Sequence, residues 1–318
     1  MTKAPDLQQA PKLPKEIIQA GLNGDLILFI GAGISRLAKY PTWGELAWKT
    51  LNALVKVELL NHSELDQLKQ LDAKKQLSIA ELIAAEYGFN LDVPQYFQLS
   101  GDTPTIYRTI NNIGCTCVTT NYDELLSPVF DPEKDLDVRD TSAVSKETVR
   151  IFEKDKFFAK HLDVPGTVVH LHGSISNPKE MVVTTKDYLD HYEHEKVPYF
   201  LREMFSKKVV LFLGYGLEEV EVLEHILRKG DVKGDVGDKK ERRRFALQGY
   251  FRSQDPLYQK LHRYYENSFG VHVIGYIRDH NDYAEQETIL KDWSSRIEIR
   301  KPHLAKDIDL IYEVLGHE

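Results

Sequence analysis

Cysteine is scarce in this sequence: Cys115 and Cys117 are the only two among 318 residues. They stand two apart in a predicted strand, so their side chains point to the same face, too close along one strand for an easy disulfide. Two thiols also fall short of a four-cysteine zinc site. We therefore expect a reducing, cytoplasmic environment and no bound metal.

Long apolar runs and a surplus of positive charge are also missing. No apolar run approaches the roughly 20 residues that span a bilayer. Residues 1–14 are polar and proline-punctuated, so we expect a flexible arm and no signal peptide there. The net charge of −8 argues against a nucleic-acid-binding surface over the whole protein. We expect neither membrane association nor direct nucleic-acid binding.

One basic run departs from this charge balance. Residues 239–244 carry five basic side chains around Glu241. Such a run is typical of a solvated loop, and a dedicated phosphate or nucleic-acid site is the alternative interpretation.

The sequence does contain a strong strand-and-turn signal near its start. Residues 26–30 are five large apolar residues in a row, which indicates a strand buried on both faces of a parallel sheet. Gly31-Ala32-Gly33 follows, where positive φ is available and the backbone N–H groups are left uncovered for a ligand. The turn is typical of a dinucleotide phosphate site. An ordinary tight strand-to-helix connection is the alternative, because Arg36 stands where the usual third glycine would be.

A long helical segment separates this strand from the next one. Thr42 and Glu45 have the spacing of a capping box, which predicts a helix start. Apolar residues then recur at helical spacing, and we find no strand between residues 62 and 112. We predict a helical insertion over residues 45–112, between the first and second strands of the sheet.

Further strands and helices alternate along the rest of the chain. We expect strands over 115–119, 167–174, 209–216, 245–247 and 271–274. We expect helices over 15–22, 145–160, 185–206, 255–267, 282–296 and 303–315, with another starting near Val220. This alternation predicts an α/β fold with a doubly wound, Rossmann-like parallel sheet, formed by residues 1–318 as one domain.

Polar residues follow two of these strands, at the sheet edge where open α/β sheets bind ligands. Thr120-Asn121-Tyr122-Asp123 comes directly after the second strand, and His170 and His172 close the third. Asn121 can also be read as the cap of a following helix, and Asp123 as favouring that helix start. If the strand continues to residue 174, both histidines point to the same face.

Four corners of the chain, in this order and spacing, resemble the successive motifs of the sirtuin family. They are Gly31-Ala32-Gly33-Ile34-Ser35, Thr119-Thr120-Asn121-Tyr122-Asp123, Leu171-His172-Gly173-Ser174 and Leu213-Gly214-Tyr215-Gly216-Leu217. The resemblance covers roughly residues 25 to 275 and implies a Rossmann-like core that binds NAD. It implies that His172 and Asn121 are the catalytic residues. The NAD-binding residues that it implies are Gly31, Ala32, Gly33, Ser35, Thr120, Asp123, Gly214, Tyr215 and Gly216.

The chain departs from sirtuin deacylases at two places. It lacks their zinc ribbon of paired cysteines after Gly173, and it has Tyr40-Pro41-Thr42-Trp43 where they have a Gly-Ile-Pro-x-Phe-Arg stretch. This form is similar to the bacterial sirtuin-like proteins of anti-phage defence, in which the domain resembles an NAD hydrolase. The resemblance also implies a separate sensor, with a HerA-type ATPase as the partner. We expect a homo-oligomer that is restrained until a signal arrives, because an unrestrained NAD hydrolase would kill its host.

The proposed chemistry suits the residues. Cleavage of the nicotinamide–ribose bond passes through an oxocarbenium-like state, so the protein mainly supplies positioning and one base. A histidine such as His172 titrates near neutral pH, and the neutral Asn121 amide can hold a water or a ribose hydroxyl without titrating. The product would be ADP-ribose, with NAD as substrate. An NAD-dependent protein deacylase and a non-catalytic nucleotide-binding scaffold remain the alternatives.

Overall fold

A single all-parallel sheet forms the centre of the molecule. The computed structural model describes residues 5–98, 101–129, 148–217, 222 and 242–300. The sheet has seven strands in the order β3-β4-β2-β1-β5-β6-β7. The strands are β1 (Leu26–Ile30), β2 (Thr116–Thr119), β3 (Val149–Ile151), β4 (Thr167–His170), β5 (Val209–Leu213), β6 (Arg244–Tyr250) and β7 (Val271–Ile277). The predicted doubly wound α/β fold is confirmed.

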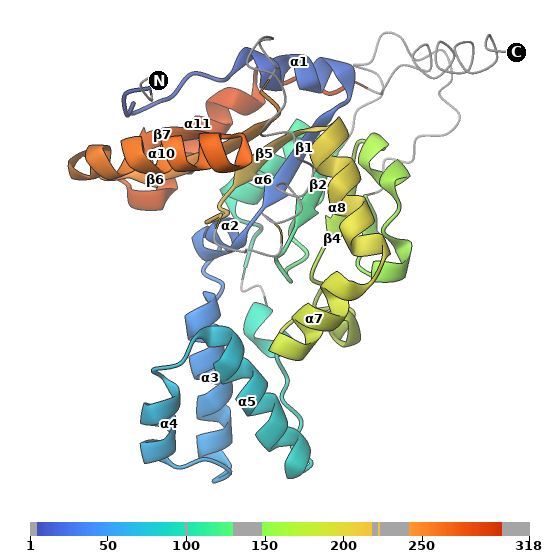
Figure 1. The fold of residues 1–318 in the computed structure, drawn as a ribbon, viewed down its shortest axis with the longest axis vertical. Coiled ribbons are helices and arrows are strands. Elements are labelled where there is room, and N and C mark those ends of the chain that lie inside the picture. Colours follow the sequence, from blue (N-terminus) through green and yellow to red (C-terminus); the bar gives the residue numbers. More distant parts are fainter. Residues whose placement is uncertain (1–4, 99–100, 130–147, 218–221, 223–241, 301–318) are drawn as a thin grey trace, which may run out of the picture.

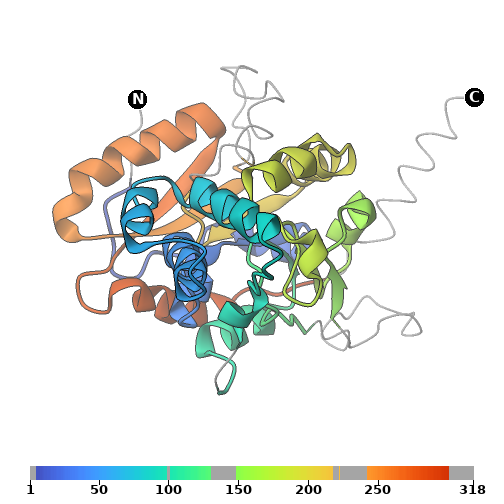
Figure 2. The same ribbon diagram turned by 90° about the horizontal axis from the view of Figure 1, so that it is seen from below.

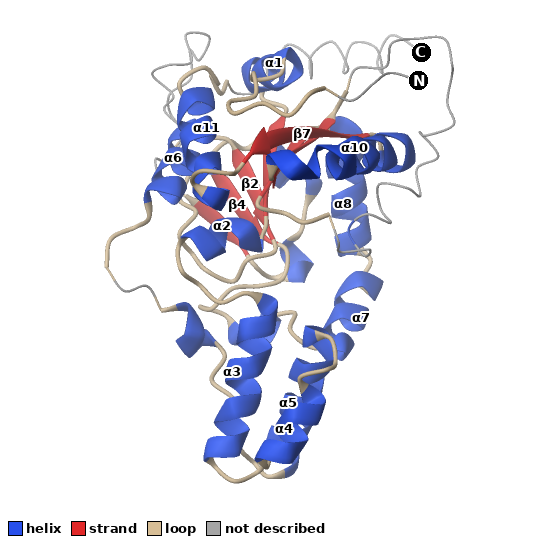
Figure 3. Ribbon diagram, turned by 90° about the vertical axis from the view of Figure 1, so that its left-hand side faces the viewer, coloured by secondary structure: helices blue, strands red, loops and turns tan. Residues whose placement is uncertain are grey.

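Helices cover both faces of this sheet (Figures 1 and 3). Within the described residues they are α1 (Lys15–Asn23), α2 (Ala32–Leu37), α3 (Trp43–Lys56), α4 (His62–Leu68), α5 (Ala73–Glu86), α6 (Thr105–Ile113), α7 (Thr185–Glu193), α8 (Lys196–Lys207), α10 (Asp255–Phe269) and α11 (Glu285–Ser294). Short 3₁₀ helices occur at Pro94–Phe97, Lys154–Lys156, Ala159–Asp163, Pro178–Glu180, Arg252–Gln254 and Asp282–Ala284. None of the helices in the described part of the chain is long and apolar enough to cross a bilayer.

β1 is the central strand and is completely enclosed. Leu28 and Ile30 pack into the apolar layer beneath α1, α6 and α11, whereas Ile27 and Phe29 pack into the layer beneath α8. Every residue of the strand is buried, which is why its sequence is a continuous apolar run rather than an alternating one. Chain order reverses around β1, since β2 lies on one side of it and β5 on the other. Such a switch point opens a crevice at the carboxyl ends of the strands.

α3, α4 and α5 form a helical module that projects from that carboxyl edge. The views in Figures 1 and 3 place the module below the sheet, and Figure 2 looks onto it from below. It has an apolar core of its own, built from Leu51, Leu54, Leu60, Leu65, Ala80 and Ala84. The predicted capping box starts it: the Glu45 N–H donates to Thr42 Oγ1, and the Thr42 N–H donates to Glu45 Oε2. α6, in contrast, packs into the core under the sheet.

Several predicted elements need correction. The prediction of a helix over 145–160 is wrong. Residues 149–151 form the edge strand β3, and only 3₁₀ turns follow it within that range. The 185–206 helix divides at His194 and Glu195 into α7 and α8. Residues 121–129 contain no helix, so Asn121 caps none. The helix near Val220, the helix over 303–315 and part of the basic run at 239–244 lie outside the described residues.

The described part of the predicted N-terminal arm is packed against the domain. Gln8 forms a bridge with Tyr276 of β7, and Leu13 is buried in the main core. The indole N–H of Trp293 donates to the Pro11 carbonyl at 3.1 Å. These contacts tie the segment to β7 and α11 even though its sequence is polar.

The turn after β1 and the turn after β5 touch each other at the switch point. The Gly31 N–H donates to the Leu213 carbonyl at 2.9 Å, and the Gly33 N–H donates to the Gly214 carbonyl at 2.7 Å. A Cβ on Gly33 would lie 2.8 Å from Gly214 Cα, and one on Gly214 would lie 2.5 Å from the Ile34 nitrogen. Gly214 also has a φ of +60°. Glycine is therefore required here for backbone-to-backbone packing.

Replacing Gly214 by alanine should destabilise the fold strongly. The left-handed backbone alone costs roughly 1–2 kcal/mol for a residue with a Cβ, and the clash with the Ile34 nitrogen adds to it. We expect Gly214→Ala to lower the free energy of unfolding in urea by about 2 kcal/mol or more. Gly44→Ala is the matched control, because a Cβ on this helical residue of α3 would meet no atom within 4 Å. Equal stability of the two variants would contradict this account.

Candidate functional site

A large cavity lies at the carboxyl ends of β1, β5 and β6. Its volume is about 860 Å³, within the ~300–1,000 Å³ usual for ligand sites. Five of the residues implied by the resemblance line it, namely Ala32, Gly33, Gly214, Tyr215 and Gly216. The start of the helical module forms another part of the lining, through Thr42, Trp43 and Gly44. Sheet edge and module together thus form one recess large enough for a dinucleotide.

The glycine turn does not offer the hydrogen-bond donors that were expected of it. The N–H groups of Gly31 and Gly33, predicted to be uncovered, donate to Leu213 at the end of β5 and to Gly214 in the loop that follows. The glycines instead allow the backbone at Ala32 and the start of α2 to border the cavity directly, because few side-chain atoms separate them from it. The turn therefore shapes the recess through close backbone packing rather than through free N–H groups at these two positions.

A second, much smaller cavity adjoins the first. Its volume is about 30 Å³, and its lining includes Ser35, Thr120 and Asn121. Ala32 and Trp43 line both cavities, which makes the two neighbours. The predicted residues from the first and second strands thus meet in one place, as the parallel sheet requires.

Asn121 is held at this small cavity by its backbone and its side chain. Its N–H donates to Thr119 Oγ1 at 3.0 Å, and its side-chain Nδ2 donates to the Gly31 carbonyl at 3.1 Å. The side chain is buried. Nδ2 donates one of its two hydrogens to Gly31, so the amide oxygen and one N–H remain for a water or hydroxyl in the cavity.

Asp123 lies behind the small cavity and anchors Ser35. Ser35 Oγ donates to Asp123 Oδ2 at 2.6 Å, and the Tyr107 hydroxyl donates to the same oxygen at 2.9 Å. Burial raises the pKa of the Asp123 carboxyl, and the two hydrogen bonds oppose that rise. Burial likewise raises the pKa of Tyr107 well above its usual value. The hydroxyl of Ser35, expected to contact phosphate, is thus directed at a carboxylate.

His172 occupies a separate, fully buried position. Its Nε2 lies 2.9 Å from the Tyr192 hydroxyl of α7, and its ring packs edge-on against Tyr188 and His191. Nδ1 has no hydrogen-bond partner among the described residues. Burial, then the nearby His191 and Lys74, hold the pKa of His172 well below its usual range. The ring is therefore neutral at pH 7, and its burial makes it a weaker base than an exposed imidazole.

His170 and His172 do not share one face, contrary to the expectation. β4 ends at His170, and the chain turns at residues 171–173. The His170 Nδ1–H donates to the Asn121 carbonyl at 3.3 Å, whereas His172 contacts α7. Burial lowers the pKa of His170 to about 4. His170 supports the Asn121 backbone, and His172 lies on the opposite side of the turn.

The described structure connects His172 to Asn121 only indirectly. The Val182 N–H donates to the His172 carbonyl at 3.0 Å, and the hydroxyl of Tyr122, next to Asn121, donates to the Val182 carbonyl at 2.6 Å. Sequence reasoning missed Tyr107 and Tyr192, the partners of Asp123 and His172. Both lie on helices, and a tyrosine in a helical pattern carries no signal of its hydrogen-bond partner.

Two comparisons with known proteins agree with this arrangement. The model of the SIR2-like domain family matches residues 116–274, half of the chain. That span begins at β2, after the glycine turn. Over 322 aligned residues, 95% of this chain, the sequence is 23% identical to Defense-associated sirtuin 2 of Bacillus subtilis. The alignment covers 28% of that protein, so this chain spans little more than a quarter of its curated relative.

Acid should destabilise the protein through its buried histidines. Burial lowers the pKa of His170 to about 4 and of His191 to about 3, and that of His172 is also well below normal. A histidine in the unfolded chain has a pKa of about 6.5, so below that pH the unfolded chain binds protons that the folded chain does not. As the pH falls, the free energy of unfolding therefore decreases by up to about 1.4 kcal/mol per pH unit for each histidine. Urea unfolding at pH 7, 6 and 5 measures this slope.

A variant isolates the contribution of one ring. His191→Phe removes one of the three titrating groups and keeps a ring beside Phe157, which His191 contacts edge-on. The stability of the variant should fall less steeply between pH 6.5 and pH 5 than that of the parent. The same slope in both proteins, or no slope at all, would contradict the assignment.

Proposed function

This chain belongs to the SIR2-like domain family, and on that premise we propose that it binds NAD+ and hydrolyses its nicotinamide–ribose bond. The observation that carries the proposal is the pair of adjoining cavities at the switch point of the sheet. The large one has room for a dinucleotide, and the small one holds the Asn121 side chain at its margin. A substrate that reaches from one into the other passes Ala32 and Trp43, which line both.

The reaction follows from what the residues at this edge can do. Water adds to the ribose carbon as the bond to nicotinamide breaks, so NAD+ and water become ADP-ribose, nicotinamide and a proton. Neutral His172 is the proposed proton acceptor, from the water or from a ribose hydroxyl. The free oxygen of the Asn121 amide is proposed to hold that water or hydroxyl in place. The departing nicotinamide is neutral, so the proposal asks for no Lewis acid.

A second candidate function is a nucleotide-binding scaffold without catalysis. The burial of His172 favours it, because neither ring nitrogen reaches the surface and Nε2 contacts Tyr192. Catalysis by His172 therefore requires the segment after β4 or α7 to move when substrate binds. An NAD-dependent deacylase is the third candidate, and no observation at the described site favours it over hydrolysis.

Replacing the two proposed catalytic residues separates these functions. His172→Ala and Asn121→Ala should each reduce NAD+ cleavage by about 10²–10⁴-fold, the usual scale for loss of a positioned acid–base group. The double variant should be little worse than the poorer single one, because residues that act as a unit are not additive. The assay follows nicotinamide and ADP-ribose by chromatography, with NAD+ affinity and Tm measured on the same samples.

The control for these variants is His280→Ala, which removes an exposed histidine. It should leave cleavage, affinity and Tm unchanged. If His172→Ala folds and still cleaves NAD+ at the parent rate, the mechanism is wrong. If the parent protein binds NAD+ and releases no nicotinamide, the hydrolase function is wrong and the nucleotide-binding scaffold is the better assignment.

We further propose that the chain acts in anti-phage defence, by depleting NAD+, as a homo-oligomer with a HerA-type ATPase partner. The name of the Bacillus subtilis relative supports the defence role. We also propose that its activity is restrained until a signal arrives, because an unregulated NAD+ hydrolase would kill its own cell. Cytoplasmic localisation and the lack of direct nucleic-acid binding remain predictions.

Assembly through the helical module is a testable part of this proposal. Leu82 of α5 is 71% exposed and Tyr87 at its end is 62% exposed, so this helix presents two apolar side chains on the surface of the module. Leu82→Asp should shift the protein toward monomer in light scattering, because a charge replaces a side chain that the contact would bury. Leu257→Asp on α10, at a site that is 46% exposed, is the control. A monomeric parent protein would overturn the proposal.

A further inference from the structure

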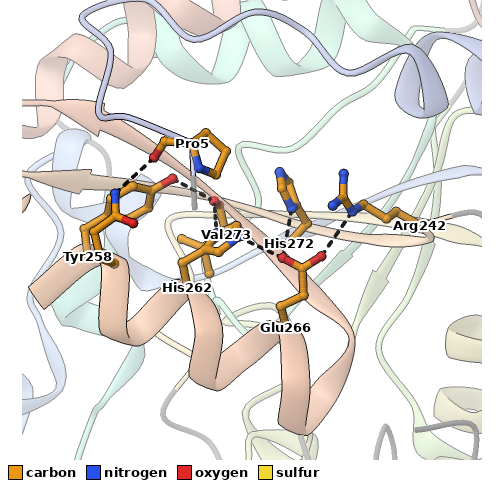
Figure 4. Close-up of polar contacts among 8 residues, drawn as sticks. Pro5, Arg242, Tyr258, His262, Glu266, His272 and Val273 are labelled. Carbon is orange, nitrogen blue, oxygen red and sulfur yellow. Dashed lines mark hydrogen bonds and ion pairs between the residues drawn. The ribbon is translucent and has the colours of Figure 1, made fainter. Parts of the chain in front are cut away.

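Three potential metal ligands converge between α10 and β7, outside the residues assigned to NAD+ (Figure 4). They are His262 and Glu266, one turn apart on α10, and His272 on β7. One ligand atom from each lies within 4.8 Å of the other two. The side chain of His262 is 5% exposed and that of His272 is 12% exposed, so the two imidazoles are shielded from solvent.

We propose that His262, Glu266 and His272 form a site for a divalent transition-metal ion of the zinc type. Two imidazole nitrogens and one carboxylate oxygen are a donor set that suits zinc, and the hard ions Mg²⁺ and Ca²⁺ prefer oxygen ligands throughout. In the structure, His262 Nε2 lies 2.8 Å and His272 Nδ1 lies 3.4 Å from the same oxygen, Glu266 Oε2. The two histidine nitrogens thus approach the same carboxylate oxygen, and all three ligand atoms lie within 4.8 Å of one another.

The hydrogen bond on the far side of His262 prepares it as a ligand. His262 Nδ1 lies 2.9 Å from the Val273 carbonyl, and because a carbonyl only accepts, Nδ1 carries the proton. In the neutral ring Nε2 then bears a lone pair, and Nε2 lies 2.8 Å from the carboxylate oxygen Glu266 Oε2. Something positive must lie between the two atoms, either an additional proton or a metal ion. Metal-bound histidines commonly donate their other N–H to a backbone carbonyl in this way.

The distances are close to those that an ion needs. Ligand bonds of about 2.0–2.2 Å in a tetrahedron place ligand atoms about 3.4 Å apart. The separation of 3.4 Å between His272 Nδ1 and Glu266 Oε2 meets this value. The separation of 2.8 Å from His262 Nε2 must lengthen by about half an ångström for an ion to bind.

The remaining groups around the cluster are compatible with an ion. Arg242 Nε donates to Glu266 Oε1 at 3.1 Å, which leaves Oε2 for the two histidines. The other neighbours are rings: Phe245 packs edge-on against His272, and Tyr258 against His262. The ion pair with Arg242 favours the ionised form of the Glu266 carboxylate, which is the form that a metal ligand takes.

An ion here would join α10 to β7 beside the large cavity. Leu261 and Tyr265 of α10, neighbours of His262 and Glu266 in the sequence, line that cavity, as does Tyr276 of β7. His262 and Glu266 themselves lie on the side of the helix that meets β7. The metal would thus stabilise the packing of α10 on β7 at one side of the cavity without contacting the cavity itself.

The test uses the full chain, stripped with EDTA and dialysed, with Zn²⁺ alone as the probe. We expect one equivalent of bound zinc by elemental analysis and a rise in Tm of about 5 °C at a hundredfold excess over Kd. Mg²⁺ at the same concentration should produce no rise. His272→Ala and Glu266→Gln should each weaken zinc binding by about 100-fold or more.

The two variants and one control keep the result unambiguous. Glu266→Gln preserves the size of the side chain, so it tests the charge without a cavity if His272→Ala unfolds. His62→Ala, which removes an exposed histidine of α4, controls for zinc held at the surface and should bind like the parent. Parent protein that binds no zinc, or variants that bind zinc as tightly as the parent, would show that the cluster is only a histidine–carboxylate ion pair.

Discussion

The contact between two glycine-containing loops is the constraint on which the rest of the site depends. The turn after β1 and the turn after β5 are joined by the hydrogen bonds from Gly31 to Leu213 and from Gly33 to Gly214. Because a Cβ at any of the three glycines would meet backbone atoms at under 3 Å, the two turns can approach only with glycine in these positions. Their closeness places Ala32 in both cavities and brings the Gly31 carbonyl to the Asn121 side chain.

The parts of the fold that were predictable from sequence are those set by local pattern. The apolar runs of β1 and β5 indicate strands enclosed on both faces, and the Thr42–Glu45 spacing marks the start of α3. β3 was not predictable, since its three residues form a sheet edge with no apolar run. The break between α7 and α8 was missed because apolar residues continue at helical spacing on both sides of it.

The positions of some candidate residues in the fold were predictable from sequence, and their environments were less so. Sheet topology alone brings Thr120 and Asn121 to the turn after β1, so the sequence order of the motifs was sufficient. The roles of Ser35 and His172 depend instead on partners far away in the chain. Ser35 shares a carboxylate with Tyr107, and His172 meets Tyr192 on a helix whose position relative to β4 is a matter of tertiary packing. No local pattern encodes such contacts.

The small cavity has a consequence for how the proposed substrate would be received. At about 30 Å³ it has room for a few water molecules, whereas a nicotinamide ring is several times larger. Trp43 and Phe97, two of its walls, pack on Tyr122, so admitting the ring means displacing aromatic contacts that stabilise the resting protein. Part of the binding energy of NAD+ would be used for that displacement, which weakens apparent affinity by the same amount. If NAD+ is cleaved at this site as proposed, the small size of the cavity would itself keep the resting protein inactive, and a contact that loosens the helical module would activate it.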